Sequence, residues 1–247
     1  LSGDLVSNGD FSQEGSELIT NGDFATDTAW TKGSGWTISG GKANASATTG
    51  QLYQGTTTTI NTQYKINYTI SNYVSGSYNF LLRGTSTATF SGNGTFTVYI
   101  TSGSNGNSNF IIDGVSSFTG SIDNVSVKEV GQDWSVIDSD ANNFVEFTQG
   151  QARLKFLNTS PITQLRATAP FVSGKKYKLI VDVANVASGS IKVANAGINE
   201  TFDTIGISTR IINPTGTSNI EFYRASADVD ITLNSVSLIE ITDDTNL

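Results

Sequence analysis

Aromatic side chains beside planar polar ones are the groups of this chain best suited to hold a ligand. An aromatic ring can stack on the C–H face of a sugar, while Asn, Gln, Asp and Arg can hydrogen-bond its hydroxyls. Such a site binds its ligand without breaking a bond. The candidate ligand-binding residues are Trp30, Tyr53, Tyr73 and Arg83 in the first half of the chain, and Tyr223 and Arg224, near Arg166, in the second.

The local sequence places these residues in or beside expected strands and turns. Trp30 lies in a turn-like stretch, Tyr53 sits between two glutamines, and Tyr73 follows a strand-like run. Arg83 falls opposite the apolar residues of its own alternating run. Each also has an alternative role in packing, which is the role that we expect for Trp36.

Most catalytic arrangements are excluded by composition. The chain has no histidine, cysteine or methionine, so imidazole bases, thiolates and the commonest metal ligand are missing. Paired carboxylates could still hydrolyse a glycoside, but an acidic chain produces such pairs by chance. We therefore predict no enzyme and no required cofactor. The available carboxylates are Asp138, Asp140, Glu146, Asp203, Glu221 and Asp228.

The charge balance argues against nucleic acid as a partner. The formal net charge is −8, and the 14 Lys and Arg residues are scattered along the sequence. Phosphate binding needs clustered basic residues that release counterions. The sequence has no apolar run of the roughly 20 residues that a membrane span requires, so we also expect no membrane insertion.

The elements that must position these side chains are short antiparallel strands. In one run Tyr64, Ile66, Tyr68 and Ile70 fall on one face while polar residues fall on the other, which is the period of a half-buried strand. Gly-rich and Ser-rich breakers separate similar runs, and no segment reads as a helix. The sequence therefore predicts an all-β protein of two tandem antiparallel β-sandwich (jelly-roll) domains.

Two domains are expected because the motifs recur after about 110 residues, which is a whole domain rather than a short repeat. Asn21–Phe24 is matched with Gly131–Trp134, and Tyr64–Ile66 with Tyr177–Leu179. The expected boundaries are 1–15 for an N-terminal extension or linker, 16–130 and 131–242 for the two jelly-roll modules, and 243–247 for a tail.

The N-terminal residues repeat the opening motif in brief. Leu5–Phe11 reappears thirteen residues later as Leu18–Phe24. Residues 1–15 could add an edge strand to another copy of the chain, or they could be a linker from a preceding module. Because the first and last strands of such sandwiches commonly pair, we expect the Asn21–Phe24 opening beside the Asp123–Val127 closing strand.

The opening and closing motifs resemble a known family. They are similar to the galactose-binding-like jelly rolls of carbohydrate-binding modules in families four, nine, sixteen and twenty-two. The resemblance covers residues 16–130 and extends more faintly over 131–242. Tandem modules of this type resemble segments of phage and marine bacterial surface proteins. The motifs are Leu18–Phe24, Trp30, Gly35–Ile38 and Ser121–Val127.

The resemblance implies a structural calcium near the paired terminal strands of the first module, held by carboxylate and carbonyl oxygens. Asp123 matches the closing carboxylate, and Asp23 lies in the opening motif. The acidic residue that usually follows the opening Phe is Ala25 here, and Asn234 replaces the closing Asp in the second copy. The alternative for Asp23 is a turn residue that hydrogen-bonds its own backbone.

Two functions are compatible with these features. One is a non-catalytic glycan-binding protein that acts in adhesion to a cell-surface polysaccharide. The other is a structural building block of a fibre, appendage or surface layer, in which the jelly rolls mediate assembly. Both predict an extracellular, cell-surface or virion-surface location.

Overall fold

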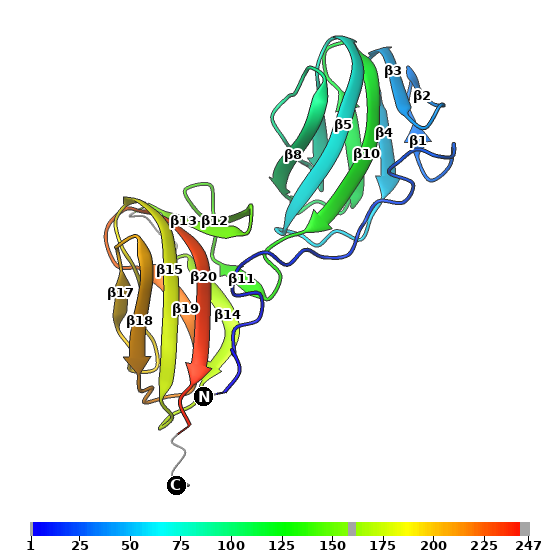
Figure 1. Ribbon diagram of the computed structural model, residues 1–247. Helices are drawn as coiled ribbons and strands as arrows, with labels where there is room; N and C mark the ends of the chain where they lie inside the picture. Colours follow the sequence, from blue (N-terminus) through cyan, green and yellow to red (C-terminus); the bar gives the residue numbers. More distant parts are fainter. Residues whose placement is uncertain (1, 158–161, 243–247) are drawn as a thin grey trace. The chain divides into compact units, whose positions relative to one another are not determined.

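The computed structural model describes residues 2–157 and 162–242, and none of these residues lies in a helix. The chain folds into two compact units (Figure 1). The first module is Glu14–Val130, and the second module combines residues 2–13 with the chain from Gly131 onward. The tail expected at 243–247 lies outside the described residues. The all-β prediction is confirmed, because each module is an antiparallel β-sandwich.

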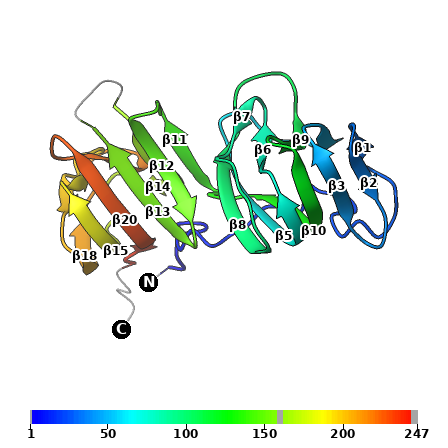
Figure 2. The same cartoon turned by 90° about the horizontal axis from the view of Figure 1, so that it is seen from above.

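Two five-stranded sheets build the first module, with strand orders β1-β4-β9-β6-β7 and β2-β3-β10-β5-β8. Figure 2 shows β8, β5, β10 and β3 side by side in one layer. The strands are β1 (Thr31–Lys32), β2 (Trp36–Ile38), β3 (Ala43–Thr48), β4 (Gln51–Gly55), β5 (Gln63–Ser75), β6 (Tyr78–Leu82), β7 (Thr85–Ser86), β8 (Gly94–Thr101), β9 (Asn109–Gly114) and β10 (Phe118–Glu129).

The second module repeats this arrangement with strand orders β11-β14-β19-β16-β17 and β12-β13-β20-β15-β18. Both modules therefore have one topology. The strands are β11 (Trp134–Ile137), β12 (Asn143–Thr148), β13 (Gln151–Phe156), β14 (Gln164–Phe171), β15 (Tyr177–Ser188), β16 (Ile191–Val193), β17 (Glu200–Phe202), β18 (Gly206–Ile212), β19 (Ser218–Arg224) and β20 (Val229–Glu240).

The core of each module comes from alternating residues that point between the two sheets. Tyr64, Ile66, Tyr68 and Ile70 of β5 are all buried, as the period-two pattern predicts. Tyr68 packs edge-on against Phe80 of the facing sheet, with ring centroids 4.7 Å apart. Large aromatic rings thus fill the space between the sheets and fix which face of each strand is internal.

Residues 2–13, here called the N-terminal segment, lie along β20 of the second module. The Leu5 amide donates to the Leu238 carbonyl at 2.8 Å. Further along the segment, the Gly9 carbonyl accepts from the Val236 amide at 2.8 Å. The segment therefore occupies one edge of β20 as the opening element of the second module.

This position corrects the expectation that residues 1–15 form an extension, a linker or a strand offered to another copy. The open edge of β20 needs backbone partners, and the segment supplies them within the same chain. Its Phe11 ring is buried against Trp134, with ring centroids 5.0 Å apart. Apolar burial and backbone pairing together hold the segment in the second module.

The first module has the same opening element. The Leu18 amide donates to the Val127 carbonyl at 3.0 Å, and the Gly22 carbonyl accepts from the Val125 amide at 2.8 Å. The expectation that the opening and closing motifs lie side by side is confirmed for this module. The closing strand is β10, the counterpart of β20.

Each module also holds a tryptophan against its own opening element. The Trp30 indole donates to the Asn21 carbonyl at 3.1 Å. In the second module the Trp134 indole donates to the Asn8 carbonyl at 2.9 Å. Trp134 is thus the counterpart of Trp30, and its expected alignment with Phe24 is wrong, because the motif that matches Phe24 lies in the N-terminal segment.

The first module is therefore inserted into the second along the chain. The N-terminal segment comes first, the whole first module follows, and the remaining strands of the second module come last. Glu14 and Val130, at the two ends of the first module, form an antiparallel bridge. The insertion thus leaves and re-enters the second module at adjacent residues.

A glycine is required where each opening element crosses its closing strand. A Cβ added to Gly9 would lie 2.2 Å from the Val236 carbonyl oxygen, and one added to Gly22 would lie 1.9 Å from the Val125 oxygen. Real Cβ atoms do not approach backbone oxygens this closely. Only glycine therefore permits these backbone contacts.

We predict that Gly9→Ala lowers the free energy of unfolding of the second module by about 1–3 kcal/mol, because the segment must shift away from β20. Scanning calorimetry with hydrogen exchange would assign the loss to a module. Gly22→Ala should act on the first module instead. Gly3→Ala is the matched control, since a Cβ there meets no atom within 4 Å. An unchanged second module in Gly9→Ala would contradict the placement of the segment.

Candidate ligand-binding site

The outward face of the sheet containing β4, β9 and β6 carries an aromatic ring in an apolar row. Tyr53 of β4 pairs with Ile111 of β9, and Ile111 pairs with Leu81 of β6. All three side chains are half-buried. Because paired residues share a face of the sheet, they form a continuous apolar strip with the Tyr53 ring in it.

A polar row runs beside this strip. Gln51 pairs with Asp113, and Asp113 pairs with Asn79, on the same three strands. Gln51 and Tyr53 are two residues apart, so the rows lie about 7 Å apart along the strand. The two rows form what we call the Tyr53 face: Gln51, Tyr53, Asn79, Leu81, Ile111 and Asp113.

The polar row of the Tyr53 face contains a partly desolvated carboxylate and one atom without a hydrogen-bond partner among the described residues. Burial raises the pKa of Asp113, although a hydrogen bond with Gln51 acts in the opposite direction. The side-chain oxygen of Asn79 is buried and accepts no hydrogen bond from any residue that the structure describes.

Sequence reasoning identified only part of this face. It found Tyr53 and its two glutamine neighbours, but these glutamines have different roles. Gln54 is buried, and its side chain exchanges two hydrogen bonds with the Thr20 backbone. Strand alternation places Gln51 on the face of Tyr53 and Gln54 on the other. Asp113 and Asn79 join them only through the strand pairing.

Trp30 is not an exposed aromatic platform, which corrects that prediction. Its side chain is only 7% exposed and packs against Phe24, with ring centroids 5.1 Å apart. The indole N–H is used by the opening element of the first module. Trp30 is therefore a core residue, because the turn-like sequence around it folds back onto the sandwich.

Tyr73 lies on β5 of the other sheet and Arg83 directly follows β6, and both side chains hydrogen-bond nearby backbone. The Tyr73 hydroxyl donates to the Gly76 carbonyl at 2.9 Å, and its ring packs against the core. The Arg83 guanidinium donates to the carbonyls of Thr58 at 2.8 Å and Asn105 at 3.0 Å. These contacts close loops, so the two residues have structural roles here.

The second module brings three polar side chains together on its corresponding sheet. Arg166 of β14 pairs with Glu221 of β19, and the Arg166 Nε lies 2.8 Å from the Glu221 carboxylate. The same carboxylate accepts the Tyr223 hydroxyl. Burial and this hydrogen bond raise the pKa of Tyr223 to about 12. The expected grouping of Tyr223 with Arg166 is present, and Glu221 is the member that sequence reasoning left out of it.

Arg224 does not join this group. Its guanidinium donates to the Leu157 carbonyl, and its pairing partner on β16 is Ile191. Lys192 of β16 pairs instead with Tyr223. The outward face of this sheet thus carries charged side chains, of which Arg166 and Glu221 pair with each other.

The carboxylates expected near calcium are used in local hydrogen bonds. Asp23 accepts from the Ala25 amide at 3.3 Å, and Asp123 accepts from the Asn124 amide at 2.7 Å. The first contact is the turn alternative weighed for Asp23. Within residues 2–157 and 162–242, no group of three or more acidic side chains could hold a metal ion. Calcium binding at Asp23 and Asp123 stays a prediction.

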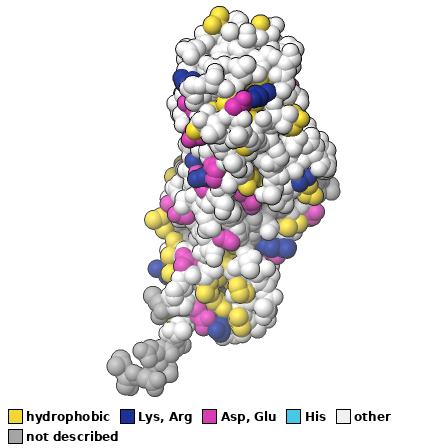
Figure 3. Space-filling view, turned by 90° about the vertical axis from the view of Figure 1, so that its right-hand side faces the viewer, with side chains coloured by type: hydrophobic (Ala, Val, Ile, Leu, Met, Phe, Trp, Pro, Cys, Tyr) yellow, Lys and Arg dark blue, Asp and Glu magenta, His cyan; other side chains and the backbone are white. Residues whose placement is uncertain are grey.

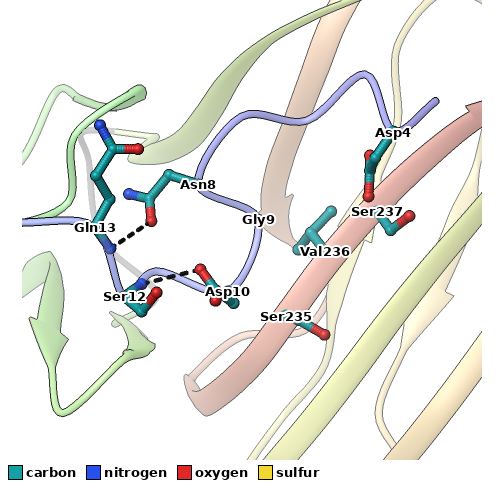
Figure 4. Close-up of a pocket in the computed structure, with 9 residues that line it drawn as sticks. All are labelled: Asp4, Asn8, Gly9, Asp10, Ser12, Gln13, Ser235, Val236 and Ser237. Atoms are coloured by element: carbon teal, nitrogen blue, oxygen red, sulfur yellow. Dashed lines mark hydrogen bonds between the residues drawn. The ribbon is translucent and has the colours of Figure 1, made fainter.

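A shallow depression of about 510 Å³ lies where the N-terminal segment meets β20 (Figure 4). Its acidic residues accept hydrogen bonds from the backbone of the segment and of β20. Asp4 accepts from the Val6 and Leu238 amides, both at 3.0 Å, and Asp10 accepts from the Ser12 amide at 3.2 Å. These contacts shape the opening element of the second module.

Several of the carboxylates considered for glycoside hydrolysis form ion pairs or turns. Glu146 contacts Arg153 at 3.4 Å. The same guanidinium is held at 2.6 Å by Asp230, which is not one of the considered carboxylates. Asp140 accepts from the Asn143 amide at 2.8 Å. Glu221 is held by Arg166. These carboxylates thus have structural partners.

Basic side chains lie singly on the face shown in Figure 3 rather than in a cluster. Such scattering agrees with the low Lys and Arg content of the chain. Among the described residues, none belongs to a helix long and apolar enough to cross a membrane.

No protein-family model and no curated protein matches the chain. Among solved structures, the tandem CBM22-1–CBM22-2 domains of Paenibacillus barcinonensis Xyn10C are similar over 93% of this chain and 99% of theirs, at 12% identity and a TM-score of 0.31. A protein of unknown function from Pseudomonas aeruginosa is similar over 78% and 82%, at 8% identity and a TM-score of 0.20. A GH2 β-galacturonidase from Eisenbergiella tayi is similar over 79% and 35%, at 8% identity and a TM-score of 0.23. At these values the likeness says nothing about ligands, while the β-sandwich fold expected from the resemblance is present in both modules.

We predict that Asp113→Asn stabilises the first module at neutral pH. Because the folded-state pKa of Asp113 is raised, wild-type stability is greatest below its ordinary pKa and is lost as pH rises through the folded-state pKa. The difference between variant and wild type should therefore vanish at acidic pH and favour the variant as pH rises. Chemical denaturation at a series of pH values measures it.

Glu14→Gln is the control of opposite sign. Lys65 lowers the pKa of Glu14, so the ion pair stabilises the fold above the ordinary pKa of Glu14 and is lost as pH falls. This variant should be less stable than wild type at neutral pH and equal to it in acid. A destabilised Asp113→Asn at neutral pH would contradict the assigned cause.

Proposed function

We propose that this chain is a non-catalytic carbohydrate-binding protein and that the Tyr53 face of its first module holds the glycan. The observation that supports this most is one aromatic ring beside three planar polar side chains on a single sheet face. Tyr53 supplies the ring, and Gln51, Asp113 and Asn79 supply the polar groups. This is the combination that a sugar ring with hydroxyl groups requires.

The chemistry of each row fits a neutral sugar. The apolar strip of Tyr53, Ile111 and Leu81 can cover the C–H face of a pyranose. Asp113 can accept hydroxyl protons, the amide of Gln51 can donate and accept, and the amide nitrogen of Asn79 can donate.

The second module is proposed to contribute less to glycan binding. Its aromatic candidate, Tyr223, already donates its hydroxyl to Glu221, and Arg166 is paired with the same carboxylate. A ligand would have to break these contacts before it could use the groups. Adhesion to an extracellular, cell-surface or virion-surface polysaccharide is the setting that goes with this proposal.

The alternative function is a structural building block of a fibre or surface layer. In that role residues 1–15 would join another copy of the chain. The pairing of the N-terminal segment with β20 of its own chain removes that support.

We predict that Tyr53→Ala weakens glycan binding by about tenfold or more, because the stacking surface is lost. A glycan array with the wild-type chain selects the ligand, and calorimetric titration measures its affinity. Tyr99→Ala is the matched control, since Tyr99 lies on β8 of the other sheet and is also half-buried. Its affinity should equal that of wild type.

Two results would overturn the proposal. One is the absence of wild-type binding to any polysaccharide tested. The other is equal binding by wild type and Tyr53→Ala. Release of new reducing ends during incubation with the bound polysaccharide would contradict the non-catalytic part alone.

A further inference from the structure

Strand β18 ends its sheet and carries exposed isoleucines. It pairs with β15 on one side and is last in the order β12-β13-β20-β15-β18. Ile207 is 73% exposed and Ile211 is 48% exposed. Thr209 lies between them on the same outward face, and Ile205 continues the alternation just before the strand. An edge strand with these side chains offers both unpaired backbone groups and apolar surface.

The corresponding strand of the first module lacks this feature. Tyr64 pairs with Ile100 of β8 as Tyr177 pairs with Ile212 of β18, so the two strands align residue by residue. The counterparts of Ile207, Thr209 and Ile211 are then Thr95, Thr97 and Tyr99. The fold itself therefore does not demand isoleucine at these positions.

The exposed residues of β18 are self-complementary in the antiparallel direction. If a second β18 pairs about Thr209, Ile207 of each copy lies opposite Ile211 of the other, and Thr209 lies opposite itself. Directly opposed side chains on one face are close enough to pack. The pairing is isologous, because both copies use the same strand. It therefore gives a closed dimer and no longer polymer.

The charges near β18 permit this pairing. Arg210, the charged residue of the strand, is turned to the other side, where it contacts Glu200 at 3.2 Å and lies over the Phe202 ring. On β15, Asp182 pairs with Ile207 and Lys178 pairs with Ile211. In the antiparallel register, a row across the two sheets therefore begins with Asp182 of one copy and ends with Lys178 of the other. The two ends of the row carry opposite charges.

We propose that a second copy of this chain binds along β18, joining the two sheets into one continuous sheet across a twofold axis. The occupant is a copy rather than another protein because register, apolar pairing and charge all match when the strand meets itself. Dimerisation is a property in addition to the proposed glycan binding by the first module. It gives the assembly two Tyr53 faces, and linked sites raise the overall affinity for a repeating polysaccharide.

A single cysteine tests the register directly. The natural sequence has no cysteine, so Thr209→Cys introduces the one thiol. Directly opposed residues have Cα atoms about 4.5–5.5 Å apart, within the range that a disulfide spans. Mild oxidation should give a covalent dimer on non-reducing electrophoresis. Thr97→Cys, at the aligned position of β8, is the matched control and should remain monomeric.

Equal cross-linking of the two cysteine variants would overturn the proposal, as would no cross-linking of Thr209→Cys. Sedimentation equilibrium of the cysteine-free chain provides a second measurement. Dimer of the wild type should be detected within a concentration range that reaches about 100 µM. The double variant Ile207→Thr with Ile211→Thr should raise the dissociation constant of the dimer by about tenfold or more.

Val74→Thr is the control for the loss of any exposed apolar side chain, since Val74 is 72% exposed in the first module. It should dimerise like wild type. A monomeric wild type, or a double variant that still dimerises like wild type, would overturn the use of β18. Calorimetry of glycan binding to the Ile207/Ile211 variant separates dimerisation along β18 from glycan binding at the Tyr53 face. Each Tyr53 face is unchanged in this variant, so a single site should still bind the glycan.

Discussion

The fold depends on one recurring constraint, the open backbone edge along the second half of each closing strand. The neighbouring strand, β3 beside β10 and β13 beside β20, pairs with only the first half of the closing strand. The chain must then supply a separate partner, because unpaired backbone groups are costly when they are shielded from water. Residues 2–13 serve β20, and the residues before Phe24 serve β10. The insertion of the first module into the second follows from where these two partners occur in the sequence.

Much of the fold could be predicted because period-two alternation is a local signal. The alternation from Tyr64 to Ile70 correctly predicts the buried face of β5. The pairing of the opening and closing motifs follows from the sandwich architecture. Which of the two modules the N-terminal segment joins could not be predicted from the sequence. Its motif nearly repeats the one ending at Phe24, and the two closing strands offer equivalent backbone. Similar side chains cannot say which of two similar edges a segment will join.

The candidate site was only partly predictable for a related reason. Tyr53 and Gln51 share a strand, so their alternation can be read directly. Asp113 and Asn79 reach the same face through the register of β4, β9 and β6, which depends on long-range pairing. Trp30 failed as a platform because its turn-like neighbours suggested exposure, whereas its indole N–H is satisfied by a buried backbone carbonyl. Burial of an aromatic ring is a tertiary property that local sequence does not determine.

The inserted arrangement has a mechanical consequence. Ser2 donates its backbone amide to the Glu240 carbonyl at 3.1 Å, so tension that enters beside residue 2 and leaves beside residue 240 acts across neighbouring strands of one module. Such tension peels the N-terminal segment from β20 one hydrogen bond at a time. Until that peeling is complete, the first module lies outside the loaded path, and its sheet face keeps its shape while the chain is pulled.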